Sequence, residues 1–384
     1  MSRRLPVFLT ALYLLPWGIQ CLVNNFIPVY VASLPFATAQ TVGDVVGLGA
    51  VITVFSQLLW SFFAGKAKNK SNVLALSLLL LGIFSLLFLI KGITKPLLFL
   101  FVTLFYSSYM AHQPLIDTIV SENYAKTRFS FGFYRSFASL GYALMAILLA
   151  LLPNGDTSLF FLYAAILAAV SLVLAKTVPC TSVTVTENTR SSRIFSRRYI
   201  CFLVYTLILF FCSSAFSAFF SVYYTSAEYL GGDISSFSIL VSVSALAEWL
   251  LVMLFAKINR RIGPTLTFLF VPLSGVFRAF TVYIAATPAT AALSFIGCAL
   301  WFGILWSAVT PYITSIVSAE DNAFAHGVWS VVSSGLGGFT GSFVSGRLVE
   351  SLDMKTLFLL LTAILAALAL LTPVLIPFRR KAGK

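Results

Sequence analysis

Charged residues are scarce in this chain. Only 10% of its 384 residues are charged and 59% are hydrophobic, whereas about 25% of a soluble globular chain is charged. About twelve apolar runs reach the roughly 20 residues that a membrane-spanning helix needs. No run alternates with the period of a barrel strand, so the backbone must form helices to satisfy its hydrogen bonds in lipid. The composition excludes a mainly soluble protein and predicts an all-α membrane protein with about twelve transmembrane helices.

The sequence also lacks the motifs of catalysis and metal binding. It has two histidines and five scattered cysteines, with no spacing typical of a metal site or a disulfide framework. It has no phosphate-binding glycine loop, nucleophile elbow or metalloprotease motif. We therefore predict that the protein is not an enzyme and needs no cofactor or metal. A channel is a weaker alternative, because no filter-like segment repeats along the chain.

Acidic residues are fewer than basic ones, 12 against 25, giving a net charge of +13. The basic residues gather in segments that would face the cytoplasm, and few lie on the other side: Lys91, Lys95, Arg347 and Lys355. This asymmetry sets the orientation of a membrane protein and does not indicate nucleic-acid binding. It predicts a multi-pass protein of the cell (inner) membrane with both termini cytoplasmic. The runs 66–70 and 379–381 are predicted to lie against anionic lipid.

One long hydrophilic stretch, residues 181–198, divides the apolar runs. We predict an N-terminal six-helix bundle over 1–180, a cytoplasmic linker over 181–198 and a C-terminal six-helix bundle over 199–384. Each half has a short basic loop after its second helix, at 66–70 and at 257–261. Such repeated halves are typical of secondary transporters. No oligomerisation signal is present, so a monomer is expected.

Two isolated charges stand in neighbouring apolar runs. Asp117 and Arg135 lie equally far from Lys126 at the turn between them (126 − 117 = 9 and 135 − 126 = 9). In a helical hairpin, that symmetry places both side chains at one depth. A charge at the centre of a spanning helix costs roughly 2.5–3.5 kcal/mol, so such charges are usually paired and functional. The spacing predicts an ion pair that binds solute, and a purely structural pair is the alternative.

Further polar residues in apolar runs are candidates for the same task. Glu248 is predicted to carry the coupling proton, because movement of a nearby arginine would change the protonation of a carboxyl group. Arg278 is the arginine expected to assist it, although it could simply neutralise Glu248. His112 is a candidate proton relay. Tyr142 and Asn24 are candidate substrate contacts, although both could serve helix packing alone.

Several of these residues resemble a known family. Pro114 and Asp117, followed by Phe131, Gly132 and Arg135, are similar to the helix 4 and helix 5 pattern of the major facilitator superfamily. The likeness is to its lactose-permease-like branch of proton-coupled symporters. The resemblance implies the major facilitator fold, and implies that Asp117 and Arg135 bind substrate.

The second half carries the resemblance further. Glu248, the run 260–263, and Arg278 after Gly275 also resemble that branch. There, the glutamate couples substrate binding to the proton and the arginine assists proton release. The resemblance therefore implies a small-molecule substrate and a proton as the coupling ion.

The chain departs from the branch at four places. Gly65 stands where the loop after the second helix normally carries an aspartate, and Tyr142 stands where lactose permease stacks its sugar on a tryptophan. Cys298 and Trp301 replace the histidine and glutamate of helix 10, so the proton route must differ. The run 301–303 is more similar to phenylpropionate permeases. Proton-coupled sugar or glycoside uptake is the leading hypothesis. Aromatic carboxylate symport, nucleoside symport and, more weakly, drug efflux are the alternatives.

Overall fold

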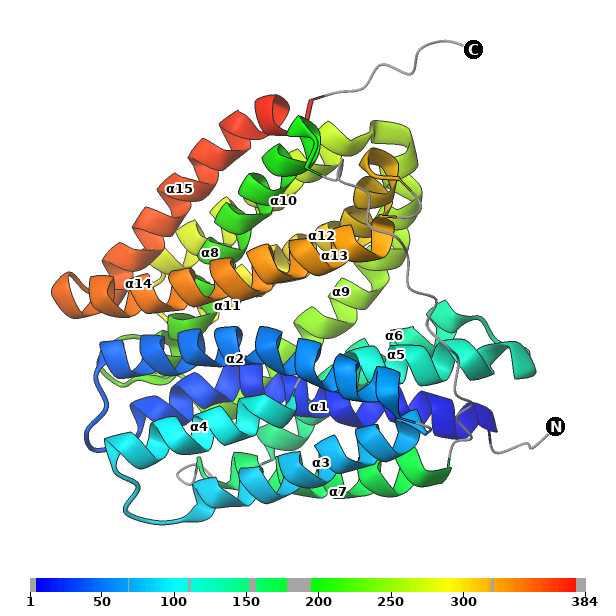
Figure 1. Ribbon diagram of the computed structural model, residues 1–384. Coiled ribbons are helices and arrows are strands. Elements are labelled where there is room, and N and C mark those ends of the chain that lie inside the picture. The colour runs from blue at the N-terminus through cyan, green and yellow to red at the C-terminus, as the bar shows by residue number, and fades with distance from the viewer. Residues whose placement is uncertain are drawn as a thin grey trace, which may run out of the picture. The chain divides into compact units, whose positions relative to one another are not determined.

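The computed structural model describes residues 5–67, 69–109, 112–151, 157–177, 195–318 and 321–377. Figure 1 shows the course of the chain and labels its helices. The chain divides into two units: unit 1 takes Met1–Thr186 with Asp233–Ser242, and unit 2 takes Glu187–Gly232 with Val243–Lys384. The predicted linker lies largely outside the described residues. The predicted division at 181–198 stays a prediction.

Unit 1 is built from long apolar helices with short connections. Its helices are α1 (Leu5–Ala32), α2 (Ala39–Lys66), α3 (Lys70–Leu86), α4 (Lys95–Tyr109), α5 (His112–Asn123), α6 (Phe131–Ala150) and α7 (Leu159–Thr177), with short 3₁₀ turns at Leu87–Leu89 and Tyr124–Lys126. α1 packs against α6 and α7, α3 packs against α7, and α2 packs against α4. α1 is therefore the central helix of this unit.

Unit 2 repeats this construction. Its helices are α8 (Arg197–Thr225), most of α9 (Ile234–Ile262), α10 (Pro264–Ile284), α11 (Pro288–Ala292), α12 (Ser294–Ile316), α13 (Asn322–Ser330), a π-helix (Val331–Gly337), α14 (Gly338–Ser351) and α15 (Met354–Leu375). α10 packs against α12 and α15, and α8 packs against α14. The first residues of α9, up to Ser242, belong to unit 1.

The prediction of an all-α membrane protein with about twelve spans is confirmed. In the described part of the chain, ten helices are long and apolar enough to cross a membrane. Two further helical segments have the length of a span but do not count among these ten. The first consists of α4 and α5, which together run over 95–123, and the second of α13, the π-helix and α14, which run without a break over 322–351. Both are too interrupted or too polar to qualify as single helices.

Helix starts follow from local sequence. The Thr38 side chain accepts from the Thr41 amide while the Thr41 hydroxyl accepts from the Thr38 amide, which is a capping box at the start of α2. The Ser130 hydroxyl accepts from the Phe133 amide at the start of α6. Ser130 therefore sets the first turn of the helix that carries Arg135.

Glycine at 141 allows α6 to approach α1 closely. A Cβ atom at Gly141 would overlap the backbone carbonyl of Leu14, whereas a Cβ atom at Gly132, on the same helix, would meet nothing within 4 Å. A backbone carbonyl cannot move aside as a flexible side chain could. The two helices can keep their spacing only with glycine at position 141.

This contact yields a stability prediction. Gly141→Ala should lower the free energy of unfolding by roughly 1–3 kcal/mol, the usual cost of overpacking. Gly132→Ala is the control, and it should leave stability unchanged or raise it by less than about 1 kcal/mol, because alanine is the better helix former. Thermal unfolding of both purified variants in one detergent measures the difference. Equal midpoints would contradict the close approach of α1 and α6.

Candidate substrate and proton sites

The predicted ion pair between α5 and α6 is present. Arg135 Nη1 lies 2.7 Å from Asp117 Oδ1 and 2.9 Å from Oδ2. The Asp117 and Arg135 side chains keep 31% and 45% of their surfaces exposed. A charge-assisted bond in an apolar helix pair holds both groups in a defined geometry. Neither side chain is fully covered by the described part of the protein.

A third residue completes this cluster. The Tyr13 hydroxyl of α1 donates to Asp117 Oδ1 at 2.5 Å, and Tyr13 itself is fully buried. Asp117 thus accepts from one arginine and one tyrosine. A carboxylate has about four acceptor positions, so it can still accept hydroxyl groups from a solute. Sequence reasoning missed Tyr13, because tyrosines are common in this chain and its pairing depends on the neighbouring helix.

Tyr13 begins a stripe of side chains along one face of α1. Trp17 follows one turn later, and its ring meets the His112 ring edge-on with centroids 5.4 Å apart. Two turns further, Asn25 donates through Nδ2 to the Tyr142 hydroxyl at 2.6 Å. Residues four apart lie on one helix face, so this spacing was the available signal for the stripe.

The stripe changes one expected contact. Asn24 was the predicted substrate residue in this helix, and it is exposed and lies off the stripe. Its neighbour Asn25 is the residue that holds Tyr142. The structure therefore brings Asp117 and Arg135 together and connects Tyr142 to α1. It does not bring Asn24 to Tyr142.

His112 is buried at the start of α5. Only 1% of its surface is exposed, and its Nδ1 atom contacts the Tyr109 carbonyl oxygen. Among the described residues, its Nε2 atom has no hydrogen-bond partner. The histidine contacts Trp17 and therefore adjoins the α1 stripe, but the hydrogen bonds found among the described residues include none from His112 to Asp117.

The predicted proton residues of unit 2 do not form an ion pair. Glu248 of α9 is half-buried, and the ion pairs found among the described residues are Lys70–Glu122 and Asp117–Arg135. Arg278 of α10 is 8% exposed, and its guanidinium carbon lies 3.9 Å from the centre of the Phe216 ring. The two side chains thus make no direct ion pair in this structure, and the role of Arg278 in proton release stays a prediction.

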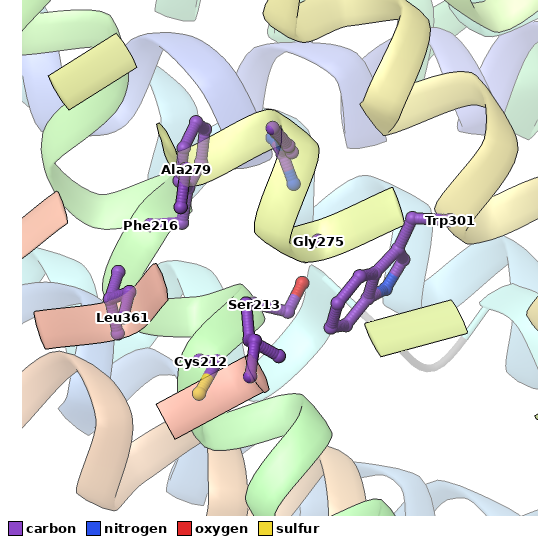
Figure 2. A pocket seen from close by; sticks show the side chains of 9 residues that line it. Cys212, Ser213, Phe216, Gly275, Ala279, Trp301 and Leu361 are labelled. Atoms are coloured by element: carbon purple, nitrogen blue, oxygen red, sulfur yellow. The ribbon is translucent and has the colours of Figure 1, made fainter. Parts of the chain in front are cut away.

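Arg278 instead lines a small cavity within unit 2 (Figure 2). The cavity volume is about 10 Å³, which suits roughly one water molecule. The Trp301 ring forms one wall and packs against Gly275, where any side chain would collide with it. Trp301, which stands where the resemblance to lactose permease would place a glutamate, thus serves as a packing surface. Cys298 is a half-buried free thiol.

A second ion pair of unit 1 lies outside this cluster. Lys70 Nζ is 2.8 Å from Glu122 Oε1, and both side chains are 9% exposed. Lys70 was predicted to lie against anionic lipid with the rest of the run 66–70, and for Lys70 that prediction is wrong. The first residue of α3 packs beside the end of α5, so its ammonium group meets a carboxylate instead of lipid.

This pair yields a second stability prediction. Lys70→Met should destabilise unit 1 by about 3–5 kcal/mol, because it leaves the Glu122 carboxylate buried with its cation removed. The double variant Lys70→Met/Glu122→Leu should recover much of the loss, since it also removes the buried carboxylate that has lost its ammonium partner. Thermal unfolding in detergent compares the variants. If the single variant proved as stable as wild type, the pair would be shown to add nothing to stability.

The described residues offer no metal site. No three histidine, cysteine, aspartate or glutamate side chains gather there where they could hold an ion. The polar groups of this part of the chain are donors and acceptors for hydrogen bonds and protons.

Long apolar helices with a few charges inside them define the class as a multi-pass membrane protein. Residues 7–360 match the MFS_1 like family, and the chain belongs to that family. It is 20% identical over 348 residues to the uncharacterized transporter YwbF of Bacillus subtilis (strain 168), covering 86% of this chain and 83% of that protein.

Solved structures share the fold. A crystal structure of the nucleoside transporter NupG superposes with a TM-score of 0.83 at 18% identity, covering 99% of this chain and 100% of that chain. A bacterial homolog of the human lysosomal transporter Spinster gives a TM-score of 0.75 at 12% identity, covering 98% and 97%. At these identities the likeness concerns the fold. The protein is an integral, multi-pass transporter and not an enzyme.

Proposed function

We propose that this transporter is a proton-coupled symporter of the lactose-permease-like branch that takes up a small polyhydroxylated solute. Sugars and glycosides are the first class, and transport proceeds by alternating access. The observation that carries the proposal is the Asp117 carboxylate, held by Arg135 and Tyr13 while part of its surface stays exposed. A structural pair alone would not need that exposure. The carboxylate accepts sugar hydroxyl groups, and the arginine donates to sugar oxygens in a fixed fork.

A nucleoside is the second candidate solute. Trp17 lies on the α1 stripe and Tyr142 is bonded to Asn25 of the same stripe. An aromatic ring of this kind can stack on a nucleobase. A nucleoside also carries ribose hydroxyl groups for Asp117. The similarity to NupG, described as a nucleoside transporter, favours this class within the same mechanism.

The proton roles complete the proposal. Glu248 carries the coupling proton, and Arg278 and His112 assist its transfer. Glu248 has no ion pair or hydrogen bond among the described residues, so no fixed cation holds it in the ionised form. A carboxyl group in such surroundings can change its protonation when its environment changes. The protein acts as a monomer in the cell membrane, with lipid around it and both termini cytoplasmic.

Uptake into energised membrane vesicles tests the proposal. The panel contains labelled lactose, a monosaccharide, uridine and an aromatic carboxylate, each with and without a proton gradient. We expect a sugar or a nucleoside to accumulate only with the gradient. Accumulation that persists after the gradient is collapsed would remove proton coupling. If only the aromatic carboxylate were taken up, the binding site would be centred on an arginine that holds the carboxylate, and not on Asp117.

A further inference from the structure

Tyr109 and His112 form a buried polar pair beside the α1 stripe. Tyr109 is 2% exposed and His112 is 1% exposed. Their ring centroids are 5.7 Å apart, with the rings inclined at 63°. The two buried rings therefore contact each other, and their polar atoms belong to adjacent side chains.

The protonation of the His112 ring follows from its neighbour. Nδ1 contacts the Tyr109 backbone carbonyl, and a carbonyl oxygen only accepts hydrogen bonds. Nδ1 must therefore carry a hydrogen. In the neutral ring, Nε2 is then a hydrogen-bond acceptor.

Tyr109 presents the complementary group. Its hydroxyl can donate, and neither this hydroxyl nor His112 Nε2 has a hydrogen-bond partner among the described residues. Buried polar atoms without partners are rare in folded proteins and costly, and each one calls for an explanation. A donor and an acceptor on two side chains whose rings contact each other can be satisfied together by one group that both accepts and donates.

We propose that Tyr109 and His112 form a subsite for one hydroxyl group, which accepts from the Tyr109 hydroxyl and donates to His112 Nε2. The group comes from water or from the transported solute, and only the second source rests on the proposed function. Trp17 contacts His112 and lies one helical turn from Tyr13, which binds Asp117. One turn of helix rises about 5.4 Å, so Trp17 links the subsite along α1 to the residue that binds Asp117.

Thermal unfolding of solute-free protein in detergent tests the subsite. With a hydroxyl group bound, Tyr109→Phe removes a satisfied bond and should lower the unfolding midpoint by about 2–4 °C. If no hydroxyl group is bound, Tyr109→Phe removes a buried hydroxyl that has no hydrogen-bond partner, and the unfolding midpoint should rise. Tyr106→Phe is the control, since this buried tyrosine of α4 contacts the Tyr109 ring. The change in unfolding midpoint caused by Tyr106→Phe is subtracted from the change caused by Tyr109→Phe.

Two histidine variants identify the acceptor. His112→Asn places an amide near the position of Nδ1 and deletes the Nε2 acceptor. His112→Gln places an amide near Nε2 and can retain it. We expect the larger fall in midpoint with asparagine. Tyr109→Phe/His112→Asn should fall no further than the more affected single variant, because both bonds go to one hydroxyl group.

Repeating the thermal unfolding with saturating lactose or uridine shows whether the hydroxyl group comes from water or from the solute. A lowered midpoint without solute assigns the hydroxyl to water. A raised midpoint without solute, together with loss of the upward shift that lactose or uridine gives the wild type, assigns it to the solute. Suppose that Tyr109→Phe does not lower the solute-free midpoint, and that lactose and uridine shift the midpoint of the variant as they shift that of the wild type. The subsite then does not exist. That result would leave gradient-driven uptake untouched, so the two proposals fail separately.

Discussion

Asp117→Asn should raise the KM for the transported solute by about 10- to 150-fold. The substitution keeps the shape of the side chain but removes the charge that both Arg135 and the solute use. Hydrogen bonds to a charged group contribute about 1.5–3 kcal/mol each, and every 1.4 kcal/mol is a factor of ten. Initial uptake rates against solute concentration, in vesicles with equal amounts of transporter, measure the change.

The same substitution at Asp44 serves as the control. Asp44 lies in α2, in the same unit and at intermediate exposure, and Asp44→Asn should leave KM within about twofold of wild type. Arg135→Lys tests the other partner, because lysine keeps the charge but cannot form the two-pronged contact. A KM unchanged in Asp117→Asn would show that the ion pair only joins α5 to α6.

Glu248→Gln should abolish accumulation driven by the proton gradient while solute exchange continues. Glutamine cannot gain or lose a proton, so the transporter can still move solute in both directions but cannot draw on the gradient. For one proton per solute, each pH unit of gradient is worth about 1.4 kcal/mol and supports a tenfold accumulation. We expect the ratio of internal to external solute to fall to about one, whatever the gradient.

Exchange is measured as counterflow of labelled solute into preloaded vesicles, and it should stay near the wild-type rate. Glu228→Gln, an exposed glutamate between α8 and α9, is the matched control and should retain accumulation. If Glu248→Gln accumulated solute like the wild type, another group would carry the proton. Loss of both accumulation and exchange would instead place Glu248 in solute binding.

The sequence by itself determined the class of fold. Apolar runs of about 20 residues with so few charges have no stable state in water, and in lipid each must be a helix. The pairing of Asp117 with Arg135 was also predictable. A short turn joins their two helices, so equal distances from Lys126 give equal depths. Local sequence therefore suffices where partners lie on adjacent helices of a hairpin.

Only the tertiary structure decided which residues of other helices contact Asp117, Arg135 and the other predicted site residues. Tyr13 of α1 bonds to Asp117, which lies 104 residues later in the sequence. Asn25, rather than Asn24, donates a hydrogen bond to Tyr142. Both outcomes depend on the rotation of α1 about its own axis, which packing against α6 sets through the close approach at Gly141. Lys70 illustrates the same limit, since its ammonium group pairs with Glu122 across two helices. Spacing in the sequence shows which residues share one face of a helix, but only the packing of the helices decides which residues of other helices contact that face.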